Sequence, residues 1–146
     1  MRQINTQIDI DASPDKVWSL LLDFESYAQW NPFIQRASGR PEVGQKLEIL
    51  MVTATGKSLA IEPVVIAAQP TREFRWVGHR LIRGLLDVEY YYMLRTAEDG
   101  RTRFVHGAVF TGLLSPFWGG FVNSALRGFF QMNEALKELA EHSVAG

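Results

Sequence analysis

Apolar and polar residues alternate along most of this chain, beginning with its first segment. Ile4, Thr6, Ile8 and Ile10 are separated by polar residues, which is the period of a strand that buries one face. Similar segments recur downstream, and Pro63 inside one of them predicts a bulge or a sheet edge. The strands that we expect are 4–10, 34–38, 46–53, 58–67, 73–79, 88–96 and 102–111. Short connections favour antiparallel pairing, so the pattern predicts a sheet of six to seven antiparallel strands.

Helical spacing is confined to two short segments near the start and one long segment at the end. Residues 13–15, a serine, a proline and an aspartate, have the order of an N-cap and a first helical turn, so a short helix begins there. A second short helix, 24–29, ends before Asn31-Pro32 because the residue before a proline disfavours helical geometry. The long helix covers 116–142, and its apolar stripe is Trp118, Val122, Ala125, Phe129, Met132, Leu136 and Leu139.

The segment Glu98-Asp99-Gly100 predicts a hairpin between the last two strands. A three-residue loop places Tyr92 opposite His106 and Tyr90 opposite Ala108, all on one side of the sheet. A two-residue loop would instead place two phenylalanines on the face that carries charged residues. We therefore expect the three-residue loop, with both tyrosines and the histidine facing the interior.

This order of elements is typical of the α+β class. A sheet of six to seven strands and one long amphipathic helix bury their apolar faces if the curved sheet wraps around the helix. The two short helices after the first strand then close one end. A curved sheet and a straight helix fit imperfectly, so we expect a cavity between them. No linker or repeat interrupts the pattern, and residues 1–146 are expected to form one domain.

Composition narrows the classes of function. The chain has 146 residues, a formal net charge of −1 and no cysteine, which argues against nucleic-acid binding, thiolate catalysis and cysteine-ligated metals. The three histidines, His79, His106 and His142, lack the spacing of a metal site, and no dinucleotide motif occurs, so we expect neither metal nor cofactor. The first residues do not resemble a signal peptide and no segment is apolar enough to cross a bilayer, so we expect a cytoplasmic protein.

Several short motifs together resemble one known superfamily. They are Ile8-Asp9-Ile10-x-Ala12-Ser13-Pro14-x-x-Val17-Trp18, Trp30-Asn31-Pro32-Phe33, Phe74-Arg75-Trp76, Gly84-Leu85-Leu86-Asp87, Gly100-x-Thr102-x-Phe104, Phe110-x-Gly112-Leu113-Leu114 and Phe129-x-x-Met132-Asn133-x-Ala135-Leu136-Lys137. With these motifs the chain resembles the START-related SRPBCC superfamily, which is also called polyketide cyclase-like. The resemblance implies the helix-grip fold with a hydrophobic ligand pocket. Relatives include lipid carriers, cyclases and hydrolases, so it implies no single activity.

Two inward-facing positions depart from the pattern expected in close relatives. Tyr90 stands where a histidine is common, and Ala108 stands where an acidic residue is common. If those polar groups serve an activity in relatives, we expect that activity to be lost or altered here.

Three residues are candidates for acid–base chemistry, namely Tyr90, Tyr92 and His106. A buried phenol needs a hydrogen-bond partner, and a tyrosine–histidine pair can polarise a ketone or relay a proton. The alternative is that His106 is a core imidazole bonded to a tyrosine or to the backbone, and that the tyrosines only pack. The residues that we expect to line the cavity are Trp30, Trp76, Tyr90, Tyr92, His106, Phe110, Val122 and Phe129.

The sequence thus predicts a protein that binds a hydrophobic small molecule, such as a lipid or a polyketide, in the cavity. One alternative is a cyclase- or dehydratase-type enzyme that acts on a polyketide-like substrate. Another is a regulatory or chaperone-linked interaction domain. Phe117 and Phe130 flank the apolar stripe of the long helix, and exposed aromatic residues there would also suit a homodimer.

Overall fold

The computed structural model describes residues 2–80 and 82–143, which form two antiparallel sheets and one long helix. The five-stranded sheet has the order β1 (Arg2–Ile10), β8 (Thr102–Thr111), β7 (Leu86–Thr96), β6 (Glu73–Arg80) and β5 (Val64–Gln69). The three-stranded sheet has the order β2 (Ile34–Ser38), β3 (Glu48–Val52) and β4 (Ser58–Ile61). The predicted α+β class is confirmed, but the strands form two sheets of five and three instead of one sheet of six to seven.

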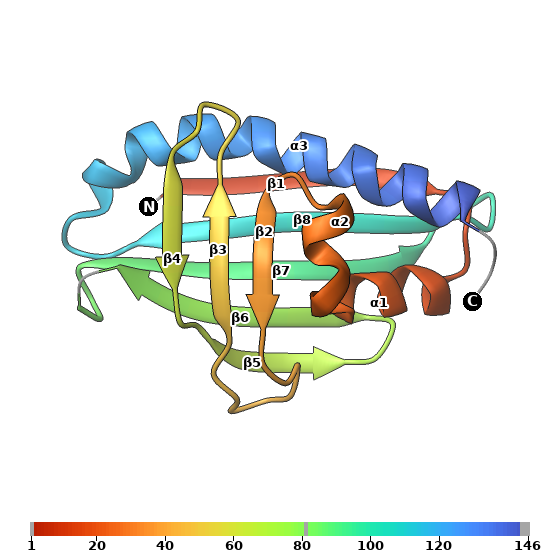
Figure 1. Ribbon diagram of the computed structural model, residues 1–146, viewed down its shortest axis with the longest axis horizontal. Helices are drawn as coiled ribbons and strands as arrows, with labels where there is room; N and C mark the ends of the chain where they lie inside the picture. The colour runs from red at the N-terminus through yellow and green to blue at the C-terminus, as the bar shows by residue number, and fades with distance from the viewer. Residues whose placement is uncertain (1, 81, 144–146) are drawn as a thin grey trace.

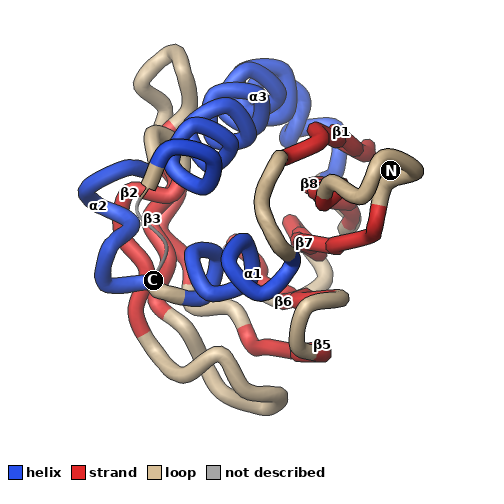
Figure 2. Tube along the Cα trace, turned by 90° about the vertical axis from the view of Figure 1, so that its right-hand side faces the viewer, coloured by secondary structure: helices blue, strands red, loops and turns tan. Residues whose placement is uncertain are grey.

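The helices cover one side and one end of the larger sheet. They are α1 (Pro14–Leu22), the 3-10 helix η1 (Phe24–Ser26), α2 (Tyr27–Trp30), the 3-10 helix η2 (Ser115–Trp118) and α3 (Gly119–His142). In Figure 1, α3 runs along the larger sheet beside β1, while β2, β3 and β4 cross in front of that sheet. Viewed from the end, the elements surround a common centre (Figure 2). The side chains that meet there form the core.

Pro63 divides what the sequence predicts as one strand, 58–67. The chain before it, β4, pairs with β3, and the chain after it, β5, pairs with β6. Proline has no N–H to continue a ladder, although its carbonyl still accepts a hydrogen bond from Leu47 N at 2.8 Å. The prediction of one continuous strand was therefore wrong, because Pro63 marks the passage of the chain from one sheet to the other. The prediction of a sheet edge is confirmed, since β4 and β5 are both edge strands.

Local signals near the first helix and the last hairpin are confirmed. The Ser13 side chain accepts a hydrogen bond from Lys16 N at 3.2 Å and caps α1, as expected for a serine before a first-turn proline. The expected helix 24–29 is divided into η1 and α2. Gly100 has a φ of +86°, as the three-residue loop between β7 and β8 requires.

The apolar stripe of α3 is buried as predicted, apart from Leu139, which is partly exposed. Close packing against the segment before β2 depends on Gly128, because a β-carbon there would lie 2.5 Å from Phe33 Cδ1. Phe33 is itself held by a turn in which Asn31 Oδ1 accepts hydrogen bonds from Phe33 N and Ile34 N, both at 2.9 Å. The Asn31-Pro32 motif therefore directs an aromatic ring onto α3.

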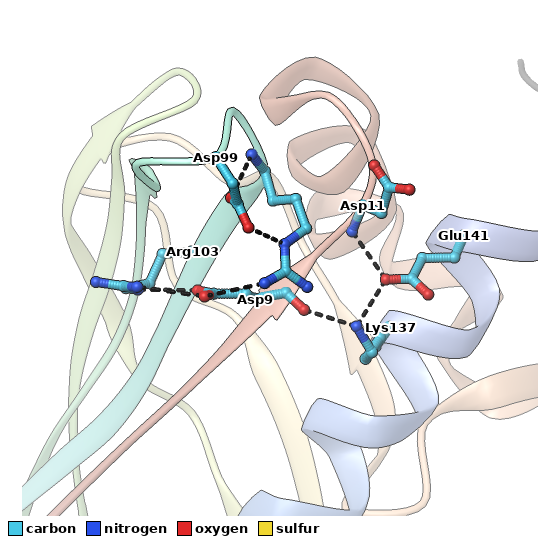
Figure 3. Close-up of polar contacts among 7 residues, drawn as sticks. Asp9, Asp11, Asp99, Arg103, Lys137 and Glu141 are labelled. Atoms are coloured by element: carbon cyan, nitrogen blue, oxygen red, sulfur yellow. Dashed lines mark hydrogen bonds and ion pairs between the residues drawn. The ribbon is translucent and has the colours of Figure 1, made fainter.

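A polar cluster at the end of α3 fixes the helix to β1 (Figure 3). Lys137 Nζ donates to the Asp9 carbonyl and to Glu141 Oε2, both at 2.7 Å, and Asp11 N donates to the same Glu141 oxygen at 2.8 Å. The Asp9 carboxylate accepts a hydrogen bond from Arg103 Nε at 2.8 Å, and this bond lowers the pKa of Asp9. We refer to Asp9, Asp11, Lys137 and Glu141 as the C-terminal clamp.

Candidate functional site

Tyr90, Tyr92 and His106 lie together on the interior face of the larger sheet, as the sequence predicts. The register of β7 and β8 pairs Tyr92 with His106 and Tyr90 with Ala108, which confirms the predicted hairpin. All three side chains are buried, and the Tyr90 hydroxyl forms a hydrogen bond with His106 Nε2. Tyr90 therefore contacts the histidine of the neighbouring strand.

The other ring nitrogen of His106 connects the sheet to α3. His106 Nδ1 lies 2.8 Å from Asn133 Oδ1, and Asn133 Nδ2 donates to Thr6 Oγ1, also at 2.8 Å. Thr6 Oγ1 in turn donates to the His106 carbonyl at 2.8 Å. Since an amide oxygen can only accept, the imidazole proton is on Nδ1, and Nε2 is free to accept the hydrogen bond of Tyr90.

Tyr92 belongs to a second short chain of hydrogen bonds. Its hydroxyl lies 3.0 Å from the hydroxyl of Tyr27 in α2, and the Tyr27 hydroxyl donates to the carbonyl of Leu21 in α1. Tyr92 is therefore the donor to Tyr27. Both chains of hydrogen bonds use buried groups from elements that are distant in the sequence.

Sequence reasoning missed Thr6, Tyr27 and Asn133 as members of this network. The alternation of the first strand places Thr6 on the buried face, among isoleucines. A hydroxyl group that is buried there needs a hydrogen-bond partner, and this was the available signal. Asn133 follows Met132 in the α3 stripe, where a buried amide needs partners in the same way. Tyr27 gave no comparable signal, because aromatic residues are common in short amphipathic helices.

Burial keeps the whole network uncharged at neutral pH. It lowers the pKa of His106 to about 3, against the opposing effect of the hydrogen bond that His106 donates to Asn133. Burial likewise raises the pKa of Tyr90 and Tyr92 well above 10.0, the ordinary value. A histidine with so low a pKa is a weak base, and a phenol with so high a pKa is a weak acid. The network suits hydrogen bonding better than proton transfer.

The side chains predicted to line a cavity pack on one another. Trp76 stacks on Tyr90 with ring centroids 4.7 Å apart, and His106 stacks on Phe129 at 4.1 Å. Phe110 and Val122 are buried in the same core, and Phe110 contacts Trp118 at a centroid distance of 5.1 Å. Trp30 is the exception because it is partly exposed at the edge of this cluster, with its ring edge-on to Tyr27 at 5.4 Å.

Two hollows formed by described residues lie outside this aromatic cluster. The larger, about 790 Å³, is lined by residues of β2, β3, β4 and β6 together with the segments around Lys46 and Glu62. The smaller, about 370 Å³, adjoins it and shares Glu62, Val64 and His79. Neither hollow is lined by any of the eight side chains predicted to line the cavity.

Two hydrogen-bond donors at the end of α2 have no partner among the described residues. They are Trp30 Nε1 and Asn31 Nδ2, and both atoms are buried. The Asn31 oxygen is fully used by the turn to Phe33, so only its amino group is left over. A buried donor without a partner costs about 1–3 kcal/mol, so the pair marks a place where an acceptor would bind favourably.

Phe117 and Phe130 are both exposed, at 78% and 51%. Phe117 belongs to η2, whereas Phe130 lies well inside α3, about 17 Å from its first residue at a rise of about 1.5 Å per residue. The two rings therefore belong to separate parts of the surface.

Within residues 2–80 and 82–143, no group of three or more histidine and acidic side chains is arranged to hold a metal ion. The same described residues contain no helix with the length and apolar character needed to cross a bilayer.

Comparison with known proteins places the chain among proteins of the same fold. The family described as Polyketide cyclase / dehydrase and lipid transport matches residues 1–143. Comparison with curated proteins gives no match.

Similar solved structures include the Zhui aromatase/cyclase from Streptomyces sp. R1128, with a TM-score of 0.75, 16% identity and coverage of 96% of this chain and 93% of that chain. A START superfamily protein from Mycobacterium smegmatis has a TM-score of 0.72 and 18% identity, covering 97% of this chain and 99% of that chain. Protein MLL2253 from Mesorhizobium loti has the same score and identity, with 98% and 99% covered. These structures support the helix-grip fold. The match over residues 1–143 shows that the chain belongs to the polyketide cyclase/dehydrase and lipid transport family.

Proposed function

We propose that this protein binds a hydrophobic small molecule, such as a lipid or a polyketide, between the five-stranded sheet and α3. The family includes lipid transport and polyketide cyclase proteins, and both act on largely apolar molecules. The interior is aromatic, and its few polar groups are neutral at physiological pH. Such a lining suits a flat apolar ligand that carries few oxygen atoms.

The unpartnered donors at the end of α2 carry this proposal. Trp30 Nε1 and Asn31 Nδ2 remain free while the tyrosines and the histidine of the interior have partners. Trp30 contacts Tyr27, and Tyr27 hydrogen-bonds to Tyr92, so the donors adjoin the aromatic cluster. A carbonyl or carboxylate oxygen of the ligand would accept from them and leave its apolar part toward the cluster.

Entry of such a ligand requires the packed rings to separate. Phe129 stacks on His106, and Phe33 packs on Phe129 with centroids 5.1 Å apart. Since these contacts join the sheet, α3 and the segment before β2, we expect ligand binding to change the environment of the buried tryptophans. Trp76 and Trp118 provide an intrinsic fluorescence signal for that change.

The first test is native mass spectrometry of protein purified from its own host, followed by fluorescence titration of delipidated protein with a fatty acid and with a polycyclic ketone. A copurifying hydrophobe or saturable binding is expected. Trp30→Phe keeps the ring and removes one donor, so it should weaken binding of an oxygen-bearing ligand about tenfold. Trp18→Phe, which changes a partly buried tryptophan of α1, is the matched control. The proposal would be refuted if no hydrophobic molecule copurified and no saturable binding were seen with either ligand.

Contact between the Tyr90 hydroxyl and His106 Nε2 favours one second candidate, a cyclase or dehydratase that polarises a ketone. That function predicts turnover of a poly-β-ketone substrate. Tyr90→Phe and His106→Gln should then abolish turnover while leaving ligand binding nearly unchanged. If the unmodified protein bound the substrate without turning it over, the enzymatic function would be excluded and the binding function would remain.

A further inference from the structure

Three large apolar side chains are exposed at one end of the molecule, on the loop from β6 to β7, on the loop from β8 to η2 and on η2 itself. Ile82 is 64% exposed, Leu113 is 83% exposed and Phe117 is 78% exposed. Figure 1 shows both loops at the end where α3 begins, away from the C-terminal clamp. We call Ile82, Leu113 and Phe117 the loop tip.

Backbone hydrogen bonds hold the two loops together. Leu113 N donates to the Gly84 carbonyl and Leu114 N donates to the Leu85 carbonyl, both at 2.9 Å. Gly112 has a φ of +114°, and a β-carbon there would overlap the Leu85 carbonyl, so only glycine allows this approach. The apolar side chains are therefore displayed by a joined frame and not by two independent loops.

Basic residues lie near the loop tip along the chain and at the start of α3. Arg80 ends β6, and Arg83 lies in the loop beside Ile82. Arg2 and Lys57 lie next to the first residues of α3, since β-carbons at positions 119 and 120 would be 3.4 Å from Arg2 Nη2 and 2.9 Å from Lys57 Nζ. Residues 80–87 and 111–120 contain one acidic residue, Asp87, and Glu62 lines the same hollows as Arg80 and Arg83. The Asp87 carboxylate accepts a hydrogen bond from Gly84 N at 2.9 Å and braces the loop.

The size of the tip argues for a lipid surface over a protein interface. Three such side chains expose about 400 Å² in all, whereas a stable protein interface buries about 800 Å² on each partner. Apolar tips with basic neighbours match a bilayer, whose acyl region accepts the apolar groups while anionic headgroups meet the arginines.

We propose that the loop tip docks reversibly on an anionic lipid bilayer, with Leu113 and Phe117 inserted among the acyl chains and Arg80 and Arg83 against the lipid phosphates. This proposal is independent of ligand binding in the interior, because the three side chains of the tip are already exposed. Failure of the docking test would leave the proposed ligand-binding function unaffected.

Flotation with lipid vesicles tests the docking surface. The protein should float with vesicles of phosphatidylcholine and phosphatidylglycerol, and only weakly with phosphatidylcholine alone. Leu113→Ser/Phe117→Ser should weaken binding at least about tenfold, because it removes most of the apolar tip. Arg80→Gln/Arg83→Gln should weaken binding to the anionic vesicles about 30-fold, at about fivefold per charge.

Leu126→Ser/Phe130→Ser is the matched control, because both residues are exposed on α3 outside the tip. Its vesicle binding should equal that of the unmodified protein. Equal binding of the tip variant and the unmodified protein, or equal loss in the control, would overturn the proposal. A concentration-dependent dimer in sedimentation that disappears in the tip variant would also overturn it, since the tip would then be a contact between two copies of this chain.

A site-specific probe reports the depth of insertion directly. The chain has no cysteine, so Phe117→Cys and Phe130→Cys can each be labelled at one position with an environment-sensitive fluorophore. The label at position 117 should shift to shorter wavelength on addition of anionic vesicles, and the label at position 130 should not. An unchanged spectrum at position 117 would refute insertion.

Discussion

Replacing His106 by glutamine should remove much of the dependence of folding stability on pH in mildly acidic solution. In the folded protein the imidazole is buried, donates from Nδ1 to Asn133 and accepts from Tyr90. It therefore stays neutral until its pKa of about 3 is reached. Unfolding exposes the ring, which then binds a proton at the ordinary histidine pKa of about 6.5.

The size of the effect follows from proton linkage. Between about pH 6.5 and about pH 3, the unfolded chain holds one more proton at position 106 than the folded protein does. The free energy of unfolding is then fully retained above pH 6.5 and falls as the pH falls, by about 1.4 kcal/mol for each pH unit. From about pH 6.5 to about pH 4.5 the loss is about 3 kcal/mol, a large share of the 5–15 kcal/mol typical of a domain.

Urea unfolding followed by tryptophan fluorescence, repeated across this pH range, measures the effect. The carboxylates of Asp9 and Glu141, whose pKa values are lowered by Arg103 and by the Asp11 backbone N–H, also contribute to the slope. Their contribution is common to both proteins and cancels in the difference. The slope of the free energy of unfolding against pH should be smaller in His106→Gln, by an amount that corresponds to nearly one proton taken up on unfolding.

Substitution of the exposed His142 by glutamine is the control and should leave the slope as it is. Nitrogen-detected NMR of the folded protein provides an independent reading, in which His106 keeps its proton on Nδ1 and does not titrate above about pH 4.5. Equal slopes for the unmodified protein and His106→Gln, or titration of His106 near pH 6.5, would refute the buried neutral imidazole.

Three further substitutions test the hydrogen bond to Asn133, the close approach of β8 to Tyr91, and the C-terminal clamp. Asn133→Leu leaves the imidazole N–H without an acceptor and should lower the free energy of unfolding by about 2–3 kcal/mol in denaturant titrations, whereas no loss would mean that the bond is not formed. Gly107→Ala should cost at least about 2 kcal/mol because a β-carbon would overlap the Tyr91 hydroxyl, while Gly119→Ala, in looser surroundings, should cost less; equal costs would contradict the close approach. Lys137→Met removes two hydrogen bonds of the C-terminal clamp and should accelerate amide exchange in the last turns of α3 only, so uniform acceleration along α3 would argue against a local clamp.

The hairpin register was predictable because local information determines it. Once Gly100 fixes a three-residue loop, pairing of Tyr92 with His106 follows from the two-residue period of strands. The passage between sheets at Pro63 was not predictable in the same way. A proline interrupts a ladder wherever it occurs, but whether the next strand returns to the same partner depends on contacts with residues far along the chain.

The candidate site was predictable only in part for a related reason. Tyr90 and His106 are close because their strands are neighbours, and the sequence indicated that. The bond from Asn133 to Thr6 joins residues 127 positions apart, and no periodicity specifies it. The free donors of Trp30 and Asn31 likewise depend on the exact placement of a turn, which patterns do not determine.

The amide of Asn133 also sets the longitudinal position of α3 along the sheet. The neighbouring buried side chains Phe129, Met132 and Leu136 are all apolar, so their burial alone does not distinguish one register of the helix from another. A shift of one helical turn would put Phe129 or Lys137 opposite His106, and neither side chain can both accept from the imidazole and donate to Thr6. The hydrogen bonds of Asn133 thus oppose a displacement of α3 along its axis, in addition to the C-terminal clamp and the close approach of Gly128 to Phe33.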